Sequence, residues 1–293
     1  MGWLGDSAVA RLRAIAAVPD LGDTRYELME EIGRGGMGVV YLARDTQLER
    51  QVAVKVLNAA DGSGEAADRL LAEARILARL EHPGIVPVHD AGALPDGRIY
   101  YAMKLVQGTR LDRFSETKPP LPELLRTFCR VCEPVGFAHS QGVFHRDLKP
   151  ANIMVGKFGE VLVLDWGLAL DGMTGGTPEF MAPEQARGDG VNARSDVYGL
   201  GKTLAFLVRR GAPPKPLVSI IRKATSPDAE LRYGGALELA ADVARFLDGV
   251  PVLAHKESFW EGAHRFASRN KVWIALMLTY VVVRAVLFFW LGR

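Results

Sequence analysis

The sequence predicts an α+β protein of two lobes, a small β-rich lobe followed by a larger helical lobe, with one more helix near the C-terminal end. Short runs typical of strands fill the part before Gly108, and helical patterns fill the part after it. Val272–Leu291 is a stretch of 20 consecutive and mostly apolar residues. A chain of 293 residues is long enough to bury a sizeable core.

Composition excludes several classes of protein. Hydrophobic residues make up 48% and charged residues 24%, which excludes wholesale disorder. The chain has 36 Lys and Arg against 34 Asp and Glu, and this balance gives no support for a nucleic-acid partner. Cys129 and Cys132 are too few for a disulfide framework, and a reducing compartment fits them. Their spacing on one predicted helix favours core packing over a redox or metal site.

The first lobe is predicted from three strand-like runs and one helix. The runs are Val39–Ala43, Gln51–Leu57 and Ile99–Val106. The helix, Glu65–Leu80, interrupts them and carries apolar residues at helical spacing. Near the N-terminus, residues 7–18 read as a short amphipathic helix.

The second lobe is predicted from longer helical patterns, which cover residues 121–142, 195–210 and 236–249. These patterns divide the chain into a helical N-terminal extension, two lobes, a basic juxtamembrane segment and an apolar helix. The predicted boundaries are 1–24, 25–106, 107–250, 251–271 and 272–291.

Residues 272–291 are predicted to anchor the chain in a membrane. A helix of this length spans about 30 Å, the thickness of the hydrocarbon layer. A buried core helix is the alternative, but Trp273 and Trp290 near the two ends resemble an interfacial aromatic belt. Arg284 interrupts the apolar run, and we expect it to snorkel toward the headgroups rather than pair with a partner helix.

Charges flanking this helix predict its orientation. Four basic residues precede it and one follows it, and no signal peptide is visible at the start. We therefore expect a single-pass protein of the cell membrane with both lobes in the cytoplasm. Formation of a homodimer through the helix is a further hypothesis, although no small-xxx-small pattern supports it. The flanking basic residues are Lys256, Arg265, Arg269 and Lys271 before the helix and Arg293 after it.

A glycine-rich motif opens the first lobe. Gly33, Gly35 and Gly38 form G-x-G-x-x-G, with Val40 shortly after. Glycines let a backbone turn sharply and approach a polyphosphate without Cβ clashes. The motif also occurs in dinucleotide-binding folds, but here a strand follows it where those folds have a helix.

Lys55 stands inside the apolar strand VAVK and therefore needs an anion, either a phosphate or a carboxylate. Glu73, on the predicted helix, is a candidate for the carboxylate. A solvated surface pair is the alternative for these two residues.

Two further motifs point to phosphoryl transfer. Residues 144–152 read FHRDLKPAN, and residues 162–167 read LVLDWG. Phosphoryl transfer from ATP needs Mg²⁺, which prefers oxygen ligands, and Asn152 and Asp165 offer them. It also needs a carboxylate that orients the attacking hydroxyl and takes its proton, a role that fits Asp147.

These motifs, followed by APE at residues 182–184, resemble the eukaryotic-like serine/threonine protein kinases of bacteria from about Arg25 to Gly249. The resemblance implies the two-lobed protein kinase fold, with ATP and Mg²⁺ as cofactors and protein Ser/Thr hydroxyls as substrates. It implies that Asp147 is the catalytic base, that Lys149 contacts the γ-phosphate and that Lys55 pairs with Glu73. Asn152 and Asp165 would hold Mg²⁺. The implied ATP-binding residues are Ile32, Gly33, Arg34, Gly35, Gly36, Gly38, Val40, Ala53, Lys55 and Met103.

The resemblance also implies supporting roles. Lys149 and Thr177 indicate Ser/Thr rather than Tyr substrates. Glu184 would pair with Arg232, and Asp196 would brace the catalytic loop.

The chain departs from the family pattern at three points. Trp166 replaces the Phe of DFG. The activation segment is short, and its Thr174 is either an autophosphorylation site or part of a tight connection. After Arg210 the helical lobe lacks a stretch that usually helps to dock protein substrates.

Two other functions stay open at this point. A nucleotide-binding pseudokinase scaffold would explain the trimmed segments, although every catalytic position carries the expected residue type. A small-molecule kinase of similar fold is the third candidate, but GTPEFMAPE, residues 176–184, resembles a peptide-binding loop.

Overall fold

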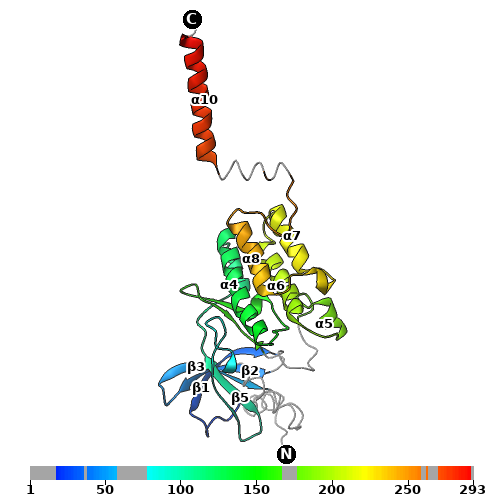
Figure 1. Cartoon of the computed structure of the whole chain (residues 1–293). Helices are drawn as coiled ribbons and strands as arrows, with labels where there is room; N and C mark the ends of the chain where they lie inside the picture. Colours follow the sequence, from blue (N-terminus) through cyan, green and yellow to red (C-terminus); the bar gives the residue numbers. More distant parts are fainter. Residues whose placement is uncertain are drawn as a thin grey trace, which may run out of the picture.

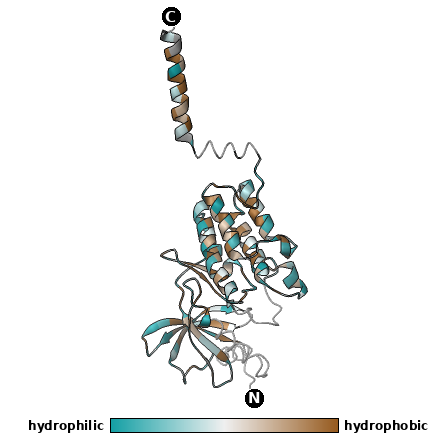
Figure 2. Cartoon of the chain, in the orientation of Figure 1, coloured by the Kyte–Doolittle hydropathy of each residue, from teal (hydrophilic) through white to brown (hydrophobic). Residues whose placement is uncertain are grey.

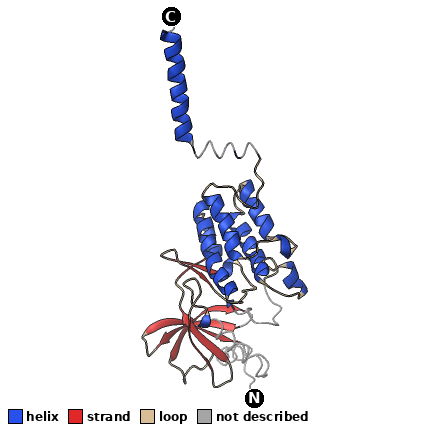
Figure 3. Cartoon of the chain, viewed as in Figure 1, coloured by secondary structure: helices blue, strands red, loops and turns tan. Residues whose placement is uncertain are grey.

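The computed structural model describes residues 18–35, 38–57, 78–166, 177–258, 262 and 270–291. Strands gather in one lobe and helices in the other (Figure 1; Figure 3), which confirms the two predicted lobes. The proposed N-terminal helix and most of the predicted helix Glu65–Leu80 lie outside the described residues.

The small lobe is a five-stranded antiparallel sheet of order β1-β2-β3-β5-β4. Strand β3 is its buried centre, because six consecutive residues from Val52 to Leu57 are excluded from solvent. An apolar cluster, which includes Leu21 and Tyr26, lies on one face of the sheet. The strands are β1 (Tyr26–Gly35), β2 (Gly38–Asp45), β3 (Arg50–Leu57), β4 (Val88–Ala93) and β5 (Ile99–Lys104).

The large lobe packs around the long helix α4 (Leu121–Ser140), whose apolar stripe contacts α6 and α8. Phe128 of α4 and Leu204 of α6 are completely buried there. Helix α6 begins with a capping box, in which Asn192 and Ser195 satisfy each other's backbone amides. The other helices are α3 (Leu111–Glu116), α5 (Pro183–Arg187), α6 (Ala193–Val208), α7 (Lys215–Ala224) and α8 (Ala236–Leu247).

The two cysteines both lie on α4. Cys132 is buried and Cys129 is half-buried, and burial raises the pKa of the Cys129 thiol to about 11. Both side chains belong to the core, as their spacing predicts.

A small three-stranded sheet packs against α3 and α4 of the large lobe. Its order is β6 (Gly108–Arg110), β7 (Ile153–Gly156) and β8 (Val161–Val163). The segment between α4 and β7 holds the HRD sequence, and the residues after β8 hold Asp165. This sheet therefore fixes the two polar motifs side by side.

The connection between α6 and α7 is short. Helix α6 ends at Val208 and α7 begins at Lys215. The described residues hold no further helix between them, and the sequence predicts such a loss.

Helix α10 (Lys271–Leu291) stands apart from both lobes (Figure 1). Hydrophobic colours predominate along it (Figure 2), and side chains such as Met277 and Val282 are exposed. Across the residues that the structure describes, none of the helices combines the length and the apolar character that crossing a membrane requires.

Candidate active site

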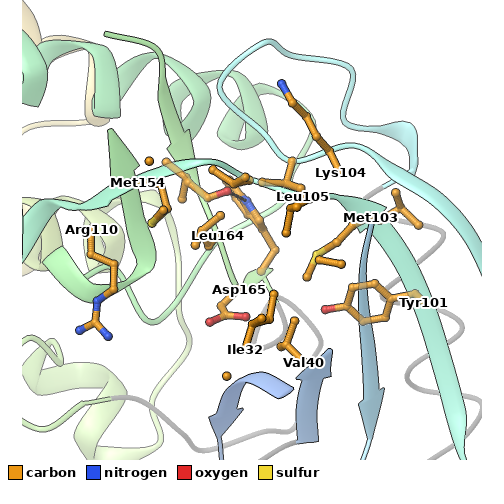
Figure 4. A pocket seen from close by; sticks show the side chains of 18 of the residues that line it. Ile32, Val40, Tyr101, Met103, Lys104, Leu105, Arg110, Met154, Leu164 and Asp165 are labelled. Atoms are coloured by element: carbon orange, nitrogen blue, oxygen red, sulfur yellow. Dashed lines mark hydrogen bonds between the residues drawn. The ribbon is translucent and has the colours of Figure 1, made fainter. Parts of the chain in front are cut away.

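A cavity of about 680 Å³ lies between the lobes. Its walls are apolar on the small-lobe side, where Ile32, Val40 and Ala53 line it, and Met103 closes one side. Figure 4 shows the Asp165 carboxylate at the polar side of this cavity, near Ile32 and Val40. A flat apolar slot with a polar end has the form expected for a nucleotide base and its phosphates.

The glycine-rich turn forms the roof. Strands β1 and β2 pair up to Gly35 and Gly38. A Cβ at Gly38 would lie 2.4 Å from the carbonyl oxygen of Val56, so only glycine lets β2 approach β3 here. A Cβ at Gly35 would meet nothing within 4 Å, so its backbone faces open space.

Lys55 of β3 contacts Asp165 at the polar side of the cavity. Its ammonium lies 3.2 Å from Oδ1 of Asp165, and the two residues come from different lobes. The lysine is buried, whereas the Asp165 side chain is 52% exposed and keeps oxygen lone pairs open to the cavity. The predicted partner Glu73 lies outside the described residues.

Asp147 is the centre of a hydrogen-bonded cluster. Lys149 Nζ lies 2.6 Å from Oδ2 of Asp147. Asn152 Nδ2 donates to the same Oδ2 at 3.0 Å and to the Asp147 carbonyl oxygen at 2.9 Å. These contacts hold the carboxylate in one orientation and leave the Asn152 amide oxygen available to a ligand.

Thr177 completes this cluster from the other side. Its amide donates to Oδ1 of Asp147 at 2.9 Å, and its hydroxyl accepts from Lys149 at 2.6 Å. The loop that begins at Thr177 is thereby attached to the carboxylate that would take a proton.

Asp196 braces the catalytic loop from α6, as the resemblance implies. Its carboxylate accepts from the amides of His145 and Arg146 at 2.7 and 2.8 Å, and it lies 2.9 Å from His139. Burial opposes ionisation of Asp196, yet the hydrogen bond and charge of His139 hold its pKa below the ordinary value. Arg146 has a φ of 68°, so this bracing holds a strained backbone beside Asp147.

Trp166 fills a buried slot below Asp165. Its indole nitrogen donates to the carbonyl oxygen of Val163 at 3.2 Å, and its ring centroid is 4.7 Å from that of His145. His145 in turn is hydrogen-bonded to the carbonyl of Leu164 at 2.8 Å. His145 therefore joins the HRD and DWG segments, which is a structural role.

Glu184 and Arg232 form the buried pair that the resemblance implies. Two guanidinium nitrogens of Arg232 donate to the two Glu184 oxygens at 2.7 and 2.8 Å, and Ser195 donates at 2.8 Å. Burial would raise the pKa of Glu184, but Arg232 and Ser195 lower it to about 2.

The polar end of the cavity fits a hard cation. Asp165 supplies carboxylate oxygens there, and Asn152 lies beside the cavity wall, where its backbone carbonyl oxygen accepts from the amide of Leu164 at 2.8 Å. Mg²⁺ is commonly held by one or two such oxygen-bearing side chains together with phosphate oxygens. Among the described residues, no group of three or more His, Cys, Asp or Glu is arranged to hold a metal without such help.

The structure brings most of the predicted site residues together. The cavity is lined by Ile32, Gly33, Val40, Ala53, Met103 and Asp165, with Lys55, Asp147, Lys149 and Asn152 at or beside its polar end. Arg34, Gly35 and Gly38 belong to the turn above it, and Arg34 is paired with Glu31. Gly36, Glu73 and Thr174 lie outside the described residues.

Two contributions are absent from the sequence prediction. Gln185 donates to the carbonyl oxygen of Arg146 at 2.6 Å and so supports the catalytic loop from α5. Arg110 and Arg113 line the cavity, and Arg110 is paired with Asp112. Figure 4 shows Arg110 on the side of the cavity near Met154. No motif marks these residues, because their positions follow from the packing of β6, α3 and α5.

Residues 26–225 match the protein kinase domain family. PknB, a serine/threonine-protein kinase of Mycobacterium tuberculosis, is 37% identical over 279 residues, covering 79% of this chain and 44% of that protein. RqkA, a DNA damage-responsive serine/threonine-protein kinase of Deinococcus radiodurans, is 42% identical over 205 residues, covering 65% of this chain and 30% of that protein. The chain thus spans less than half the length of these relatives.

Comparison with solved structures agrees with this family match. The kinase domain of Mycobacterium tuberculosis PknI superposes with a TM-score of 0.63 at 27% identity, over 78% of this chain and 97% of that one. The fold, the polar cluster and the relatives lead to one conclusion: this chain belongs to the protein kinase domain family, and its relatives are serine/threonine-protein kinases.

Proposed function

We propose that this chain is an ATP-dependent serine/threonine protein kinase, anchored in the cell membrane with its kinase domain in the cytoplasm. The observation that carries the catalytic part is the Asp147 cluster. Lys149, Asn152 and Thr177 all bond to one carboxylate beside the interlobe cavity. Such an arrangement orients a base toward a hydroxyl substrate, and a pseudokinase scaffold that only binds nucleotide does not require one.

In the proposed reaction, the oxygen of a Ser or Thr hydroxyl attacks the γ-phosphorus of ATP. The bond to the β,γ-bridging oxygen breaks, ADP leaves, and the hydroxyl proton goes to Asp147. Mg²⁺, held by Asn152 and Asp165, would neutralise the phosphate charge. Lys55 would hold the α- and β-phosphates, and Lys149 would stabilise the transferred group.

Preference for Ser and Thr is supported by the position of Lys149. Its ammonium bonds to both Asp147 and Thr177, so it fills the space beside the carboxylate. A short aliphatic hydroxyl reaches Asp147 in this arrangement more readily than a bulky phenol.

The membrane part of this proposal rests on the sequence of residues 272–291. All 20 positions from Val272 to Leu291 are apolar except Thr279, Tyr280 and Arg284. Arg284 donates to the hydroxyl of Tyr280, one turn earlier, at 3.2 Å. We expect the full chain to sediment with membranes and to resist carbonate extraction, whereas a chain ending at Lys271 should be released. Crosslinking of the full chain in the same membranes tests whether the helix also forms a homodimer.

Phosphate transfer tests the catalytic part. The full chain in detergent is incubated with labelled ATP, Mg²⁺ and a basic protein, beside its Asp147→Asn variant. We expect label with the wild type alone and unchanged nucleotide binding by the variant, because Asp147 lies outside the cavity wall. Nucleotide binding without transfer by either protein would instead favour the pseudokinase scaffold.

A further inference from the structure

We propose that Arg209 selects protein substrates that carry a carboxylate side chain near the phosphoacceptor. This inference rests on the proposed kinase function and adds a specificity-determining residue to it. Arg209 follows helix α6 at the start of the short connection to α7.

The loop beside the catalytic carboxylate leads directly to α6. Thr177 is bonded to Asp147, and a turn closed by the Phe180 amide and the Thr177 carbonyl at 2.9 Å brings Phe180 close behind it. Phe180 then packs along α6. Its carbonyl oxygen lies 3.6 Å from a Cβ placed on Gly199, and its ring centroid is 6.4 Å from that of Phe206.

Arg209 covers the outer face of this aromatic pair. Its guanidinium carbon lies 3.4 Å from the centroid of the Phe206 ring, and its amide donates to the Phe206 carbonyl at 3.5 Å. Stacking on an aromatic ring holds a guanidinium in one plane and leaves its N–H edges free for a carboxylate. Part of the conformational entropy of the Arg209 side chain is therefore lost before a ligand binds, so less is lost on binding.

The Arg209 guanidinium has no internal anion. Its side chain is exposed, and within the described part of the chain no carboxylate, carbonyl or hydroxyl accepts a hydrogen bond from it. The neighbouring Arg210 differs, because its guanidinium lies 3.4 Å from the carbonyls of Ser115 and Glu116. Arg210 thus fastens α6 to α3, while Arg209 faces the solvent beside the loop.

The short α6–α7 connection makes this surface accessible. Only six residues, 209–214, separate the two helices, and no helix among the described residues covers Phe206 from that side. A substrate chain bound along the loop from Thr177 to Phe180 therefore passes Arg209. The chain of contacts from Thr177 through Phe180 and Phe206 places the guanidinium a few substrate residues away from the acceptor.

Peptide phosphorylation tests the inference. The probes are Ser peptides of neutral sequence in which one Glu, Lys or phosphoserine is moved through the five positions on each side of the acceptor. The proteins are the full-length wild type, Arg209→Ala, Arg209→Glu and Arg222→Glu. Arg222 is the matched control because it is an exposed arginine on α7.

We expect one Glu position to raise kcat/KM of the wild type about tenfold through a lower KM, the size of one charge-assisted contact. Arg209→Ala should lose this preference, and Arg209→Glu should prefer Lys at the same position, with the neutral peptide unaffected. Arg222→Glu should behave as the wild type. The inference is overturned if the preference for Glu survives in Arg209→Glu, or if an active wild type shows no preference for Glu. A preference for phosphoserine alone would mean that Arg209 recognises a phosphate in place of a carboxylate, which also overturns it.

Binding separates this inference from the proposed function. Fluorescence anisotropy of the labelled Glu peptide reports its Kd without any transfer. If no peptide is phosphorylated but the Glu peptide binds about tenfold more weakly to Arg209→Glu than to Arg222→Glu, the kinase proposal fails and the recognition role stands. Equal Kd values for these two variants overturn the recognition role.

Discussion

The amide and the hydroxyl of Thr177 both donate to Oδ1 of Asp147, over 2.9 and 3.2 Å. The hydroxyl also accepts from Lys149 at 2.6 Å. Two contacts of different kinds therefore join the loop to the carboxylate, and they can be separated by mutation. The amide contact holds the loop in place, whereas the hydroxyl contact orders Lys149 and Asp147 for the reaction.

Thr177→Val keeps the amide and the shape but removes the hydroxyl. We expect kcat to fall by roughly 10- to 100-fold, because Lys149 and Asp147 lose a shared partner that orients them. Thr177→Ser keeps the hydroxyl and should restore most of the activity. Steady-state kinetics with a Ser peptide measures both variants, and equal kcat for Thr177→Val and the wild type would contradict the role of the hydroxyl.

Trp166→Phe restores the Phe of the family's DFG but leaves the Val163 carbonyl without its indole donor. We expect the free energy of unfolding to fall by about 0.5–1.5 kcal/mol, the net contribution of one buried hydrogen bond. Activity should stay within a few-fold of the wild type, because the contact of Asp165 with Lys55 is kept. Urea unfolding checks this prediction, with Trp273→Phe as the control, since Trp273 is 73% exposed on α10.

Helices and buried strands were the predictable part of this fold. The strands β2, β3 and β5 and the helices α4, α6 and α8 carry the apolar periodicity of their type. Strand β1 was not predicted, because its charged side chains face solvent and hide the strand pattern. The strands β6 and β8 have three residues each, too few to show any period.

The residues of the site likewise fall into those that the sequence could predict and those that it could not. Asp147, Asn152 and Asp165 stand in short motifs, so their chemistry and spacing were readable along the chain. Gln185 bonds to Arg146, which is far away in the sequence, and Arg209 stacks on Phe206, whose ring lies near that of Phe180 in the Thr177 loop. Such roles follow only from the packing of helices on the catalytic loop.

Gly38 and Gly35 offer a matched pair in the glycine-rich turn. Gly38→Ala puts a Cβ 2.4 Å from the backbone oxygen of Val56, so β2 must move away from β3. We expect this variant to lose about 1–3 kcal/mol of unfolding free energy, as overpacking does. Gly35→Ala meets nothing within 4 Å and should stay within about 0.5 kcal/mol. Urea unfolding without nucleotide measures both, and equal losses would refute the close approach of β2 to β3.

The Glu184–Arg232 pair predicts a specific pH dependence of stability. Burial opposes the charge of Glu184, but Arg232 and Ser195 lower its pKa from 4.5 to about 2. A carboxyl with a lowered pKa stabilises the folded state above its unfolded pKa, and this stability is lost as the pH falls from 4.5 toward 2. Its contribution at neutral pH is about 3 kcal/mol.

Glu184→Gln removes the charge while keeping the shape of the side chain. At pH 7 we expect the variant to be less stable by about 3–5 kcal/mol, because Arg232 is left buried without its counterion. The difference from the wild type should shrink steadily between pH 4.5 and pH 3, since only the wild type loses an ionised Glu184 there. Urea unfolding of both proteins across this range measures the difference, in which carboxyl groups common to both cancel. A difference that stays constant down to pH 3 would show that the pKa of Glu184 is not the source of its stabilising effect.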